Sequence, residues 1–190
     1  MSLPGHYLGL FLVLTVGISA CTPLHSYRDV RKTLAPNRLF EIGDQCVHVE
    51  QWGNVRGEPV LLLHGMGASA LSFDDFAEQA SGGDQYRFIA PDLHGFGYTE
   101  RLQESSHYQP QAQVDVILAL LDELNVQRVH VLGHSYGGGL AALLAQHHEL
   151  RVKSLVLVAP IRDFGNPLGL FRSRLVRELA YPALRGIVSS

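Results

Sequence analysis

The chain has 190 residues, of which 46% are hydrophobic and 17% charged, and its formal net charge is −3. Such a composition indicates a folded globular protein that can bury a core in one domain, and it excludes an intrinsically disordered chain. No basic run or Lys/Arg-rich stripe is present, so the composition argues against nucleic acid as a partner.

The N-terminal segment, residues 1–20, differs from the rest of the chain. Residues 7–20 are apolar and uncharged, about as long as the core of a signal peptide and shorter than the ~20 residues of a membrane-spanning helix. They end in a run of small residues directly before Cys21, a junction that resembles the lipobox of bacterial lipoprotein signal peptides. Residues 1–6 hold no Lys or Arg, and in this the segment departs from the usual pattern.

The resemblance implies that residues 1–20 are a signal peptide and that the Cys21 thiol receives a lipid. The protein would then be exported and held at a membrane by that lipid, in the outer membrane or facing the periplasm if the host is Gram-negative. An ordinary cleaved signal, an uncleaved anchor and a cytoplasmic protein remain as alternatives. With Cys21 lipidated, Cys46 has no disulfide partner and is expected as a buried strand thiol; a Cys21–Cys46 bridge is the other possibility.

Regular secondary structure is expected after a polar segment with two prolines, residues 21–37, which is interpreted as a linker. Residues 38–42 and 45–52 predict two strands joined by Gly43-Asp44 as a hairpin turn. The elements expected after them are strands at residues 60–63, 86–90, 128–132 and 154–158, and helices at residues 72–80, 111–125 and 136–147.

The clearest helical pattern covers residues 111–125, and Pro110 suits the first turn of this helix. The alternation of strands and helices predicts an α/β fold, with a mostly parallel sheet and helices on both of its faces. Residues 161–190 carry a further helical pattern that Pro182 interrupts. The apolar residues of the clearest helix recur at steps of three and four and form one stripe: Val114, Ile117, Leu118, Leu121 and Leu124.

A G-x-S-x-G motif with Ser135 at its centre follows an expected strand and precedes a small-residue helix. This strand-turn-helix setting is that of a nucleophile elbow, in which the serine projects above the carboxyl end of the sheet. The turn is so tight that side chains two residues before and after the serine would clash, which explains Gly133 and Gly137. The motif predicts Ser135 as a catalytic nucleophile; the alternative is a glycine-rich turn with an incidental serine.

Two further motifs accompany the elbow. His64-Gly65-Met66-Gly67 follows the expected strand at 60–63, and the sequence DLHGFGYT begins at Asp92, after the strand at 86–90. With all three motifs in this order, residues 38–160 resemble the α/β-hydrolase superfamily, in the branch that carries HGxG and GHSxGG motifs and a serine nucleophile. Esterases and carbon–carbon bond hydrolases of this branch use serine, whereas its epoxide hydrolases and haloalkane dehalogenases usually use aspartate.

The resemblance implies a serine hydrolase that acts on an ester, thioester, amide or related bond of a small molecule and needs no cofactor or metal. The backbone N–H groups of Met66 and Tyr136 would form the oxyanion hole, and His64 would brace the loop that holds the first of them. Asp92 is architectural in this family, and the catalytic histidine follows the last strand, after the acid. Asp163 would be that acid only in a less common arrangement.

The triad acid and histidine are therefore expected beyond residue 190. The chain is interpreted as the N-terminal part of a hydrolase, with an incomplete core at residues 38–160, truncated after about the sixth strand, and the start of a cap or lid at residues 161–190. Other interpretations stay open. An acyltransferase or cofactor-free haloperoxidase of this fold would use the same residues, a non-catalytic binding protein would carry a degraded elbow, and a truncated fragment would be inactive.

We expect Cys21 to carry a membrane anchor. In a bacterial host supplied with labelled fatty acid, the protein should take up the label and partition into detergent. Cys21→Ser should abolish both, because the thiol is the group that accepts the lipid. Cys46→Ala is the matched control and should leave labelling unchanged. A mature N-terminus at any residue other than Cys21 would contradict this expectation.

Overall fold

The structure is a computed structural model that describes residues 34–80, 84–161 and 164. The expected signal peptide, the lipidation site Cys21, Asp163 and most of the expected cap segment lie outside these residues. No helix in the described part combines the length and the apolar character needed to cross a bilayer. The described elements are the strands β1 (Leu39–Ile42), β2 (Gln45–Gly53), β3 (Glu58–Leu63), β4 (Tyr86–Pro91), β5 (Val129–His134) and β6 (Val152–Val158), and the helices α2 (Asp74–Ala80), α3 (Pro110–Glu123) and α4 (Tyr136–His147).

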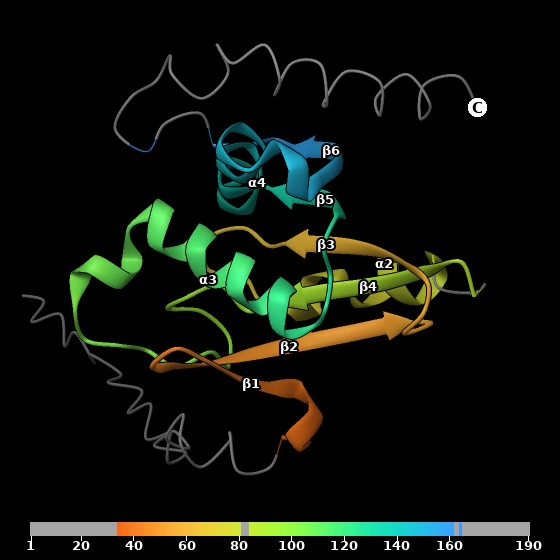
Figure 1. The fold of residues 1–190 in the computed structure, drawn as a ribbon. Helices are drawn as coiled ribbons and strands as arrows, with labels where there is room; N and C mark the ends of the chain where they lie inside the picture. The colour runs from red at the N-terminus through yellow and green to blue at the C-terminus, as the bar shows by residue number, and fades with distance from the viewer. Residues whose placement is uncertain (1–33, 81–83, 162–163, 165–190) are drawn as a thin grey trace, which may run out of the picture.

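The strands form one mixed sheet in the order β1-β2-β4-β3-β5-β6 (Figure 1). β1 and β2 make the expected hairpin, with Ile42 paired to Gln45 across a turn in which Gly43 has a φ of +63°. β2 runs antiparallel to β4, whereas β4, β3, β5 and β6 run parallel to one another. The prediction of a mostly parallel sheet is confirmed. The carboxyl ends of the parallel strands therefore meet at one edge.

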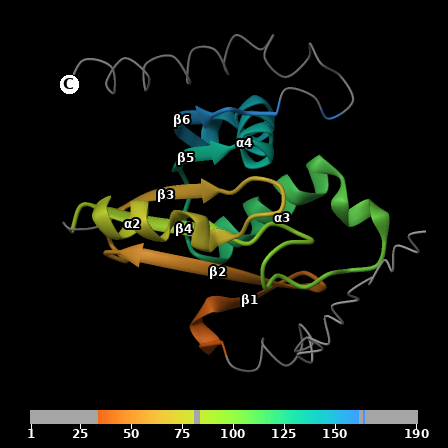
Figure 2. The ribbon, with the colours of Figure 1, turned by 180° about the vertical axis from the view of Figure 1, so that it is seen from behind.

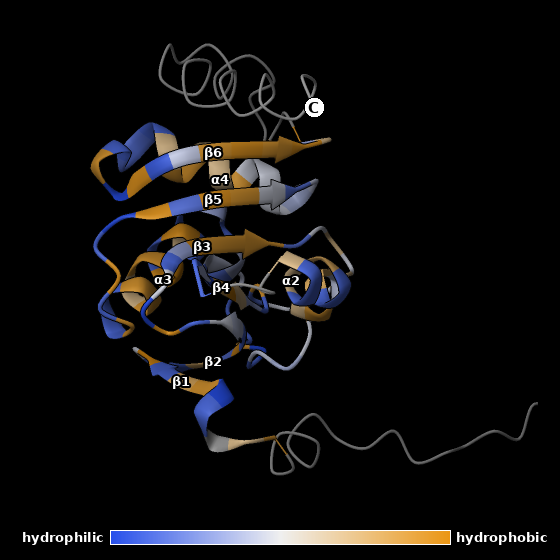
Figure 3. Cartoon of the chain, turned by 90° about the vertical axis from the view of Figure 1, so that its right-hand side faces the viewer, coloured by the Kyte–Doolittle hydropathy of each residue, from blue (hydrophilic) through white to orange (hydrophobic). Residues whose placement is uncertain are grey.

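Helices cover both faces of this sheet. α3 and α4 lie on one face and α2 on the other (Figures 1 and 2). Val114, Ile117 and Leu121 of α3 are buried in the main core, as the apolar stripe predicted. Ala77 of α2 belongs to a smaller cluster on the opposite face. The carboxyl-terminal halves of β3 and β6 are coloured as hydrophobic in Figure 3, in agreement with strands that contribute to a core.

Some element boundaries differ from those expected. The strand expected at 128–132 continues to His134, because Gly133 and His134 pair with β6. The helix expected at 72–80 is preceded by a 3₁₀ turn, Ala70–Phe73. The first difference arises because strand pairing depends on a neighbour that is distant in sequence, whereas the apolar pattern of β5 ends at Gly133. The second is local, because the 3₁₀ turn is closed by the N–H of Ser72 donating to the carbonyl of Ser69.

A buried carboxylate, that of Asp92, ties β2 to the loops after β3 and β4. Its Oδ1 accepts the N–H of Ala70 at 2.7 Å, and its Oδ2 accepts the N–H of Tyr98 at 2.7 Å and Nδ1 of His48 at 2.8 Å. Burial by itself would raise the pKa of Asp92, but the hydrogen bonds from His48 and the two backbone N–H groups outweigh it and hold the pKa below its ordinary value. An added Cβ at Gly97 would overlap this carboxylate.

Asp92→Asn should destabilise the fold at neutral pH by about 3 kcal/mol, because an amide nitrogen would face groups that donate to the carboxylate. The pKa of Asp92 is lower in the folded than in the unfolded state. The contribution of the ionised carboxylate to the free energy of unfolding is therefore fully present above the unfolded-state pKa of ~3.9. It is lost as the pH falls through the folded-state pKa. Urea unfolding at several pH values should show that the free energies of unfolding of Asp92→Asn and wild type become more similar below about pH 4.

Asp115→Asn is the control for this measurement, because Asp115 is an exposed carboxylate on α3. Its effect should stay within about 0.5 kcal/mol. If the free energies of unfolding of Asp92→Asn and wild type differ equally at neutral and acid pH, the charge of Asp92 contributes nothing to stability.

Candidate active site

Ser135 occupies the turn between β5 and α4, in the strand-turn-helix setting that the motif predicted. Its backbone has φ 52° and ψ −111°, a conformation that costs a non-glycine residue roughly 1–3 kcal/mol. Three hydrogen bonds hold the turn. The N–H of Ser135 donates to the carbonyl of Val158 at 2.9 Å, and its carbonyl accepts the N–H groups of Ile161 at 2.8 Å and Gly139 at 3.2 Å. The side chain is half-buried and so remains accessible.

The two motif glycines allow close backbone contacts around this turn. A Cβ added at Gly133 would lie 2.5 Å from the carbonyl oxygen of Gly137. A Cβ added at Gly137 would overlap the carbonyl oxygens of Leu63 and His64 at the end of β3. The Gly137 N–H also donates to the His64 carbonyl at 3.0 Å. The start of α4 therefore rests directly on the end of β3, and alanine does not fit at either glycine without a shift of the backbone.

The loop after β3 lies beside Ser135. A Cβ built on Gly65 would be 3.3 Å from the Cβ of Ser135 and 3.1 Å from Nδ1 of His134. The next residue, Met66, exposes 65% of its surface, so its side chain is not part of the core. Tyr136 is the first residue of α4, where backbone N–H groups lack partners within the helix and the helix dipole is positive. Gly65, the residue before Met66, thus lies beside Ser135, and Tyr136 directly follows Ser135 in the chain.

His64 braces this loop and is not available as a base. Its Nε2 accepts the N–H of Leu93 at 3.0 Å, so the ring proton is on Nδ1, which donates to the carbonyl of Gly65 at 2.8 Å. Burial lowers the pKa of His64, which keeps the ring neutral. Phe96 contacts the ring edge-on, with centroids 5.7 Å apart. This is the bracing role that the resemblance implied for His64.

The remaining polar groups near the site do not form a triad within the described residues. In residues 34–80, 84–161 and 164, no histidine or carboxylate hydrogen-bonds the Ser135 hydroxyl. Asp92 is committed to the loops that it ties together. The same part of the chain contains no group of three or more His, Cys, Asp or Glu side chains placed to hold a metal ion. The described arrangement places an accessible serine on a strained turn beside the loop after β3 and the start of α4.

The side-chain environment of Tyr136 was not predicted from the sequence. Its hydroxyl accepts Nε2 of Gln113 at 2.5 Å, and its ring contacts Phe96 and Phe164 at centroid distances of 6.4 and 5.5 Å. Burial raises the pKa of Tyr136 and the hydrogen bond from Gln113 opposes that effect, so the hydroxyl keeps its proton at neutral pH. The available signal was Gln113 itself, a polar residue directly before Val114, with which the apolar stripe begins.

Several known proteins with similar sequences or structures are hydrolases. The sequence profile of the alpha/beta hydrolase fold family matches residues 58–183. A 2-hydroxymuconate semialdehyde hydrolase of Pseudomonas putida is 35% identical over 131 residues, which are 67% of this chain and 46% of that protein. Lipase 1 of Psychrobacter immobilis is 39% identical over 117 residues, 61% of this chain and 35% of the lipase.

A solved structure agrees with these relatives. A mutant meta-cleavage product hydrolase from Pseudomonas fluorescens IP01, complexed with acetates, superposes with a TM-score of 0.60 at 31% identity, over 65% of this chain and 45% of that one. The chain spans about half or less of the length of these proteins. The profile match covers both the loop after β3 and the Ser135 turn. The chain belongs to the α/β hydrolase fold family.

Proposed function

We propose that the protein is a serine hydrolase that cleaves an ester, thioester, amide or related bond of a small molecule. Ser135 is its nucleophile, and the N–H groups of Met66 and Tyr136 are its oxyanion donors. The observation that carries the proposal is the strained turn of Ser135, held against the loop after β3 by the close contacts of Gly137. Backbone strain at an accessible serine is typical of an active site, whereas simple binding does not require it.

In the proposed reaction the Ser135 hydroxyl attacks the carbonyl carbon of the substrate, and its proton passes to a histidine. That histidine, with the acid that orients it, comes from outside the described residues. The negative charge that develops on the carbonyl oxygen is stabilised by the two N–H groups, each worth about 3–4 kcal/mol in comparable sites. The leaving group departs with the proton, and water then releases the acyl group from Ser135.

The similar proteins support hydrolysis as the class of reaction without selecting one bond. One is named for a semialdehyde substrate and another as a lipase. Ser135 itself favours a covalent acyl intermediate over the aspartate chemistry usual in epoxide hydrolases of this fold. We further propose that the protein works at a membrane, anchored through a lipid on Cys21. That part of the proposal depends on the junction before Cys21 in the sequence.

The full-length protein should react with a fluorophosphonate probe at Ser135, because such probes label activated serine nucleophiles. Ser135→Ala should abolish labelling, and tryptic peptide mapping should locate the adduct on the peptide that contains Ser135. Ser106→Ala, at an exposed serine of the 3₁₀ turn before α3, is the control and should label as wild type does. Labelling that persists in Ser135→Ala would refute the assignment of Ser135 as the nucleophile.

Gly137→Ala should slow fluorophosphonate labelling by about 10²-fold, because the added methyl would push the turn off the end of β3 and misplace the nucleophile. Met66→Ala should label at close to the wild-type rate, because the proposed donor at this position is the backbone N–H and the side chain is exposed. Circular dichroism should show both variants folded. Equal labelling rates in folded Gly137→Ala and wild type would mean that the contact with β3 does not position the serine.

A further inference from the structure

Gln113 is a buried polar residue on a helix face that is otherwise apolar. Its surface is 3% exposed, and it lies in α3 directly before Val114. Its Nε2 donates to the hydroxyl of Tyr136 at 2.5 Å and to the backbone carbonyl of Tyr108 at 3.4 Å. Because a carbonyl oxygen only accepts, the amide atom that faces Tyr108 is the nitrogen. The other amide atom, Oε1, is therefore an acceptor that needs a donor.

A matching donor lines the same cavity. Oε1 of Gln113 and Nε2 of His94 are both buried, and neither has a hydrogen-bond partner among the described residues. Nε2 of Gln45 contacts Nδ1 of His94 at 2.5 Å and the carbonyl of Glu100 at 3.4 Å, so the amide nitrogen donates and Nδ1 accepts. The ring proton of His94 is therefore on Nε2. Burial, followed by the nearby His107, lowers the pKa of His94 and favours this neutral ring.

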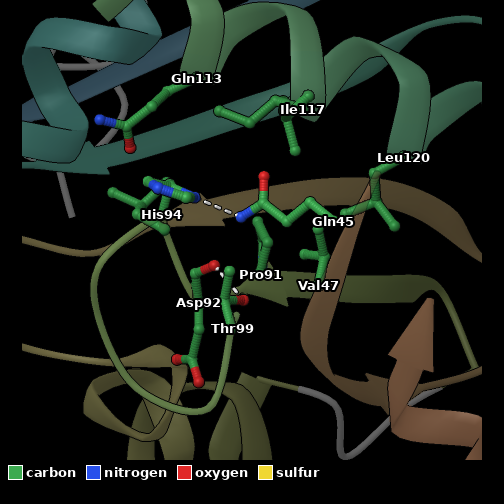
Figure 4. A pocket seen from close by; sticks show the side chains of 11 residues that line it. Gln45, Val47, Pro91, Asp92, His94, Thr99, Gln113, Ile117 and Leu120 are labelled. Atoms are coloured by element: carbon green, nitrogen blue, oxygen red, sulfur yellow. Dashed lines mark hydrogen bonds between the residues drawn. The ribbon is translucent and has the colours of Figure 1, made fainter. Parts of the chain in front are cut away.

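The cavity between these two groups has the size of one water molecule. Its volume is about 10 Å³, at the lower limit of the ~10–15 Å³ that an ordered water needs. Figure 4 shows the Gln113 amide and the His94 ring on the same side of it, with Ile117 and Leu120 of α3 completing its apolar wall. A water there would accept from Nε2–H of His94 and donate to Oε1 of Gln113, which satisfies both buried groups.

We propose that this cavity holds one structural water and that Gln113 is a positioning residue for the oxyanion hole. The water joins the loop after β4, through His94, to α3, and the Gln113 amide joins α3 to Tyr136. Tyr136 is the first residue of α4, and its N–H is the oxyanion donor of the proposed function, on which this inference rests. With the side chain of Tyr136 held on one side and the Ser135 turn on the other, the N–H keeps a fixed direction.

Ester hydrolysis by the full-length protein tests the positioning role. Gln113→Leu should lower kcat roughly tenfold with KM unchanged, because the donor is misaligned and substrate binding is not. Tyr136→Phe should have a similar effect, and the double variant should be no slower than either single one. Gln113→Glu loses the amide N–H that donates to the Tyr136 hydroxyl, but the hydroxyl can donate to the carboxylate instead, so part of kcat should be recovered relative to Gln113→Leu. Gln111→Leu, at an exposed position of α3, is the control.

A lowered melting temperature in Gln113→Leu with wild-type kcat would show that Gln113 only stabilises the fold, and would overturn the positioning role. The water is tested separately by NMR on ¹⁵N-labelled protein. His94 should be protonated at Nε2, and that proton should show a cross-peak to a long-lived water that is lost in Gln113→Leu and kept in Gln111→Leu. Protonation at Nδ1, or no such cross-peak in wild type, would overturn the water site.

The two proposals fail in distinguishable ways. A full-length protein that hydrolyses no ester and whose Ser135 resists the fluorophosphonate probe would refute the proposed function and, with it, the positioning role of Gln113. The cross-peak of His94 would still decide whether the cavity holds a water, because that measurement needs no turnover.

Discussion

The contact between the start of α4 and the end of β3 is the constraint on which the rest of the site depends. The N–H of Gly137 donates to the carbonyl of His64, and no Cβ fits between the two backbones. This contact sets the distance between the Ser135 turn and the loop that begins at Gly65. The strained backbone of Ser135 persists because strand pairing of β5 and the hydrogen bonds of the turn determine its conformation from both sides.

Two buried polar side chains, His64 and Asp92, support this edge of the sheet. Burial favours the neutral form of both, but it prevails only in His64. His64 gains no charged partner strong enough to offset burial, so its ring stays neutral and both of its nitrogens are used by backbone groups. Asp92 receives three hydrogen bonds, which outweigh burial and keep its carboxylate ionised. Both residues hold loops, and neither has a free atom for proton transfer to substrate. The presence of a titratable residue in a hydrolase motif therefore does not by itself identify a catalytic group.

The position of Ser135 follows from the topology of the sheet. β3 lies between β4 and β5, so the chain leaves β3 toward one side and enters β5 on the other. α2 follows β3 on one face of the sheet, and α3 precedes β5 on the opposite face (Figures 1 and 2). α4, which follows β5, lies on the same face as α3, so the loops that leave the carboxyl ends of β3 and β5 turn to opposite faces of the sheet, the topology at which open α/β sheets commonly bind ligands. Ser135 directly follows β5 and Gly65 follows β3, so both lie at this carboxyl edge of the sheet.

Much of this architecture could be predicted from the sequence because its signals are local. Apolar runs such as residues 60–63, the stripe of α3 and the glycines around Ser135 report short-range requirements: burial, helical periodicity and room for a tight turn. The extension of β5 to His134, the burial that keeps His64 neutral, the hydrogen bonds that keep Asp92 ionised and the link from Gln113 to Tyr136 all depend on residues far apart in the chain. Only the tertiary structure decided them, because burial and hydrogen-bond geometry depend on which distant groups packing brings together.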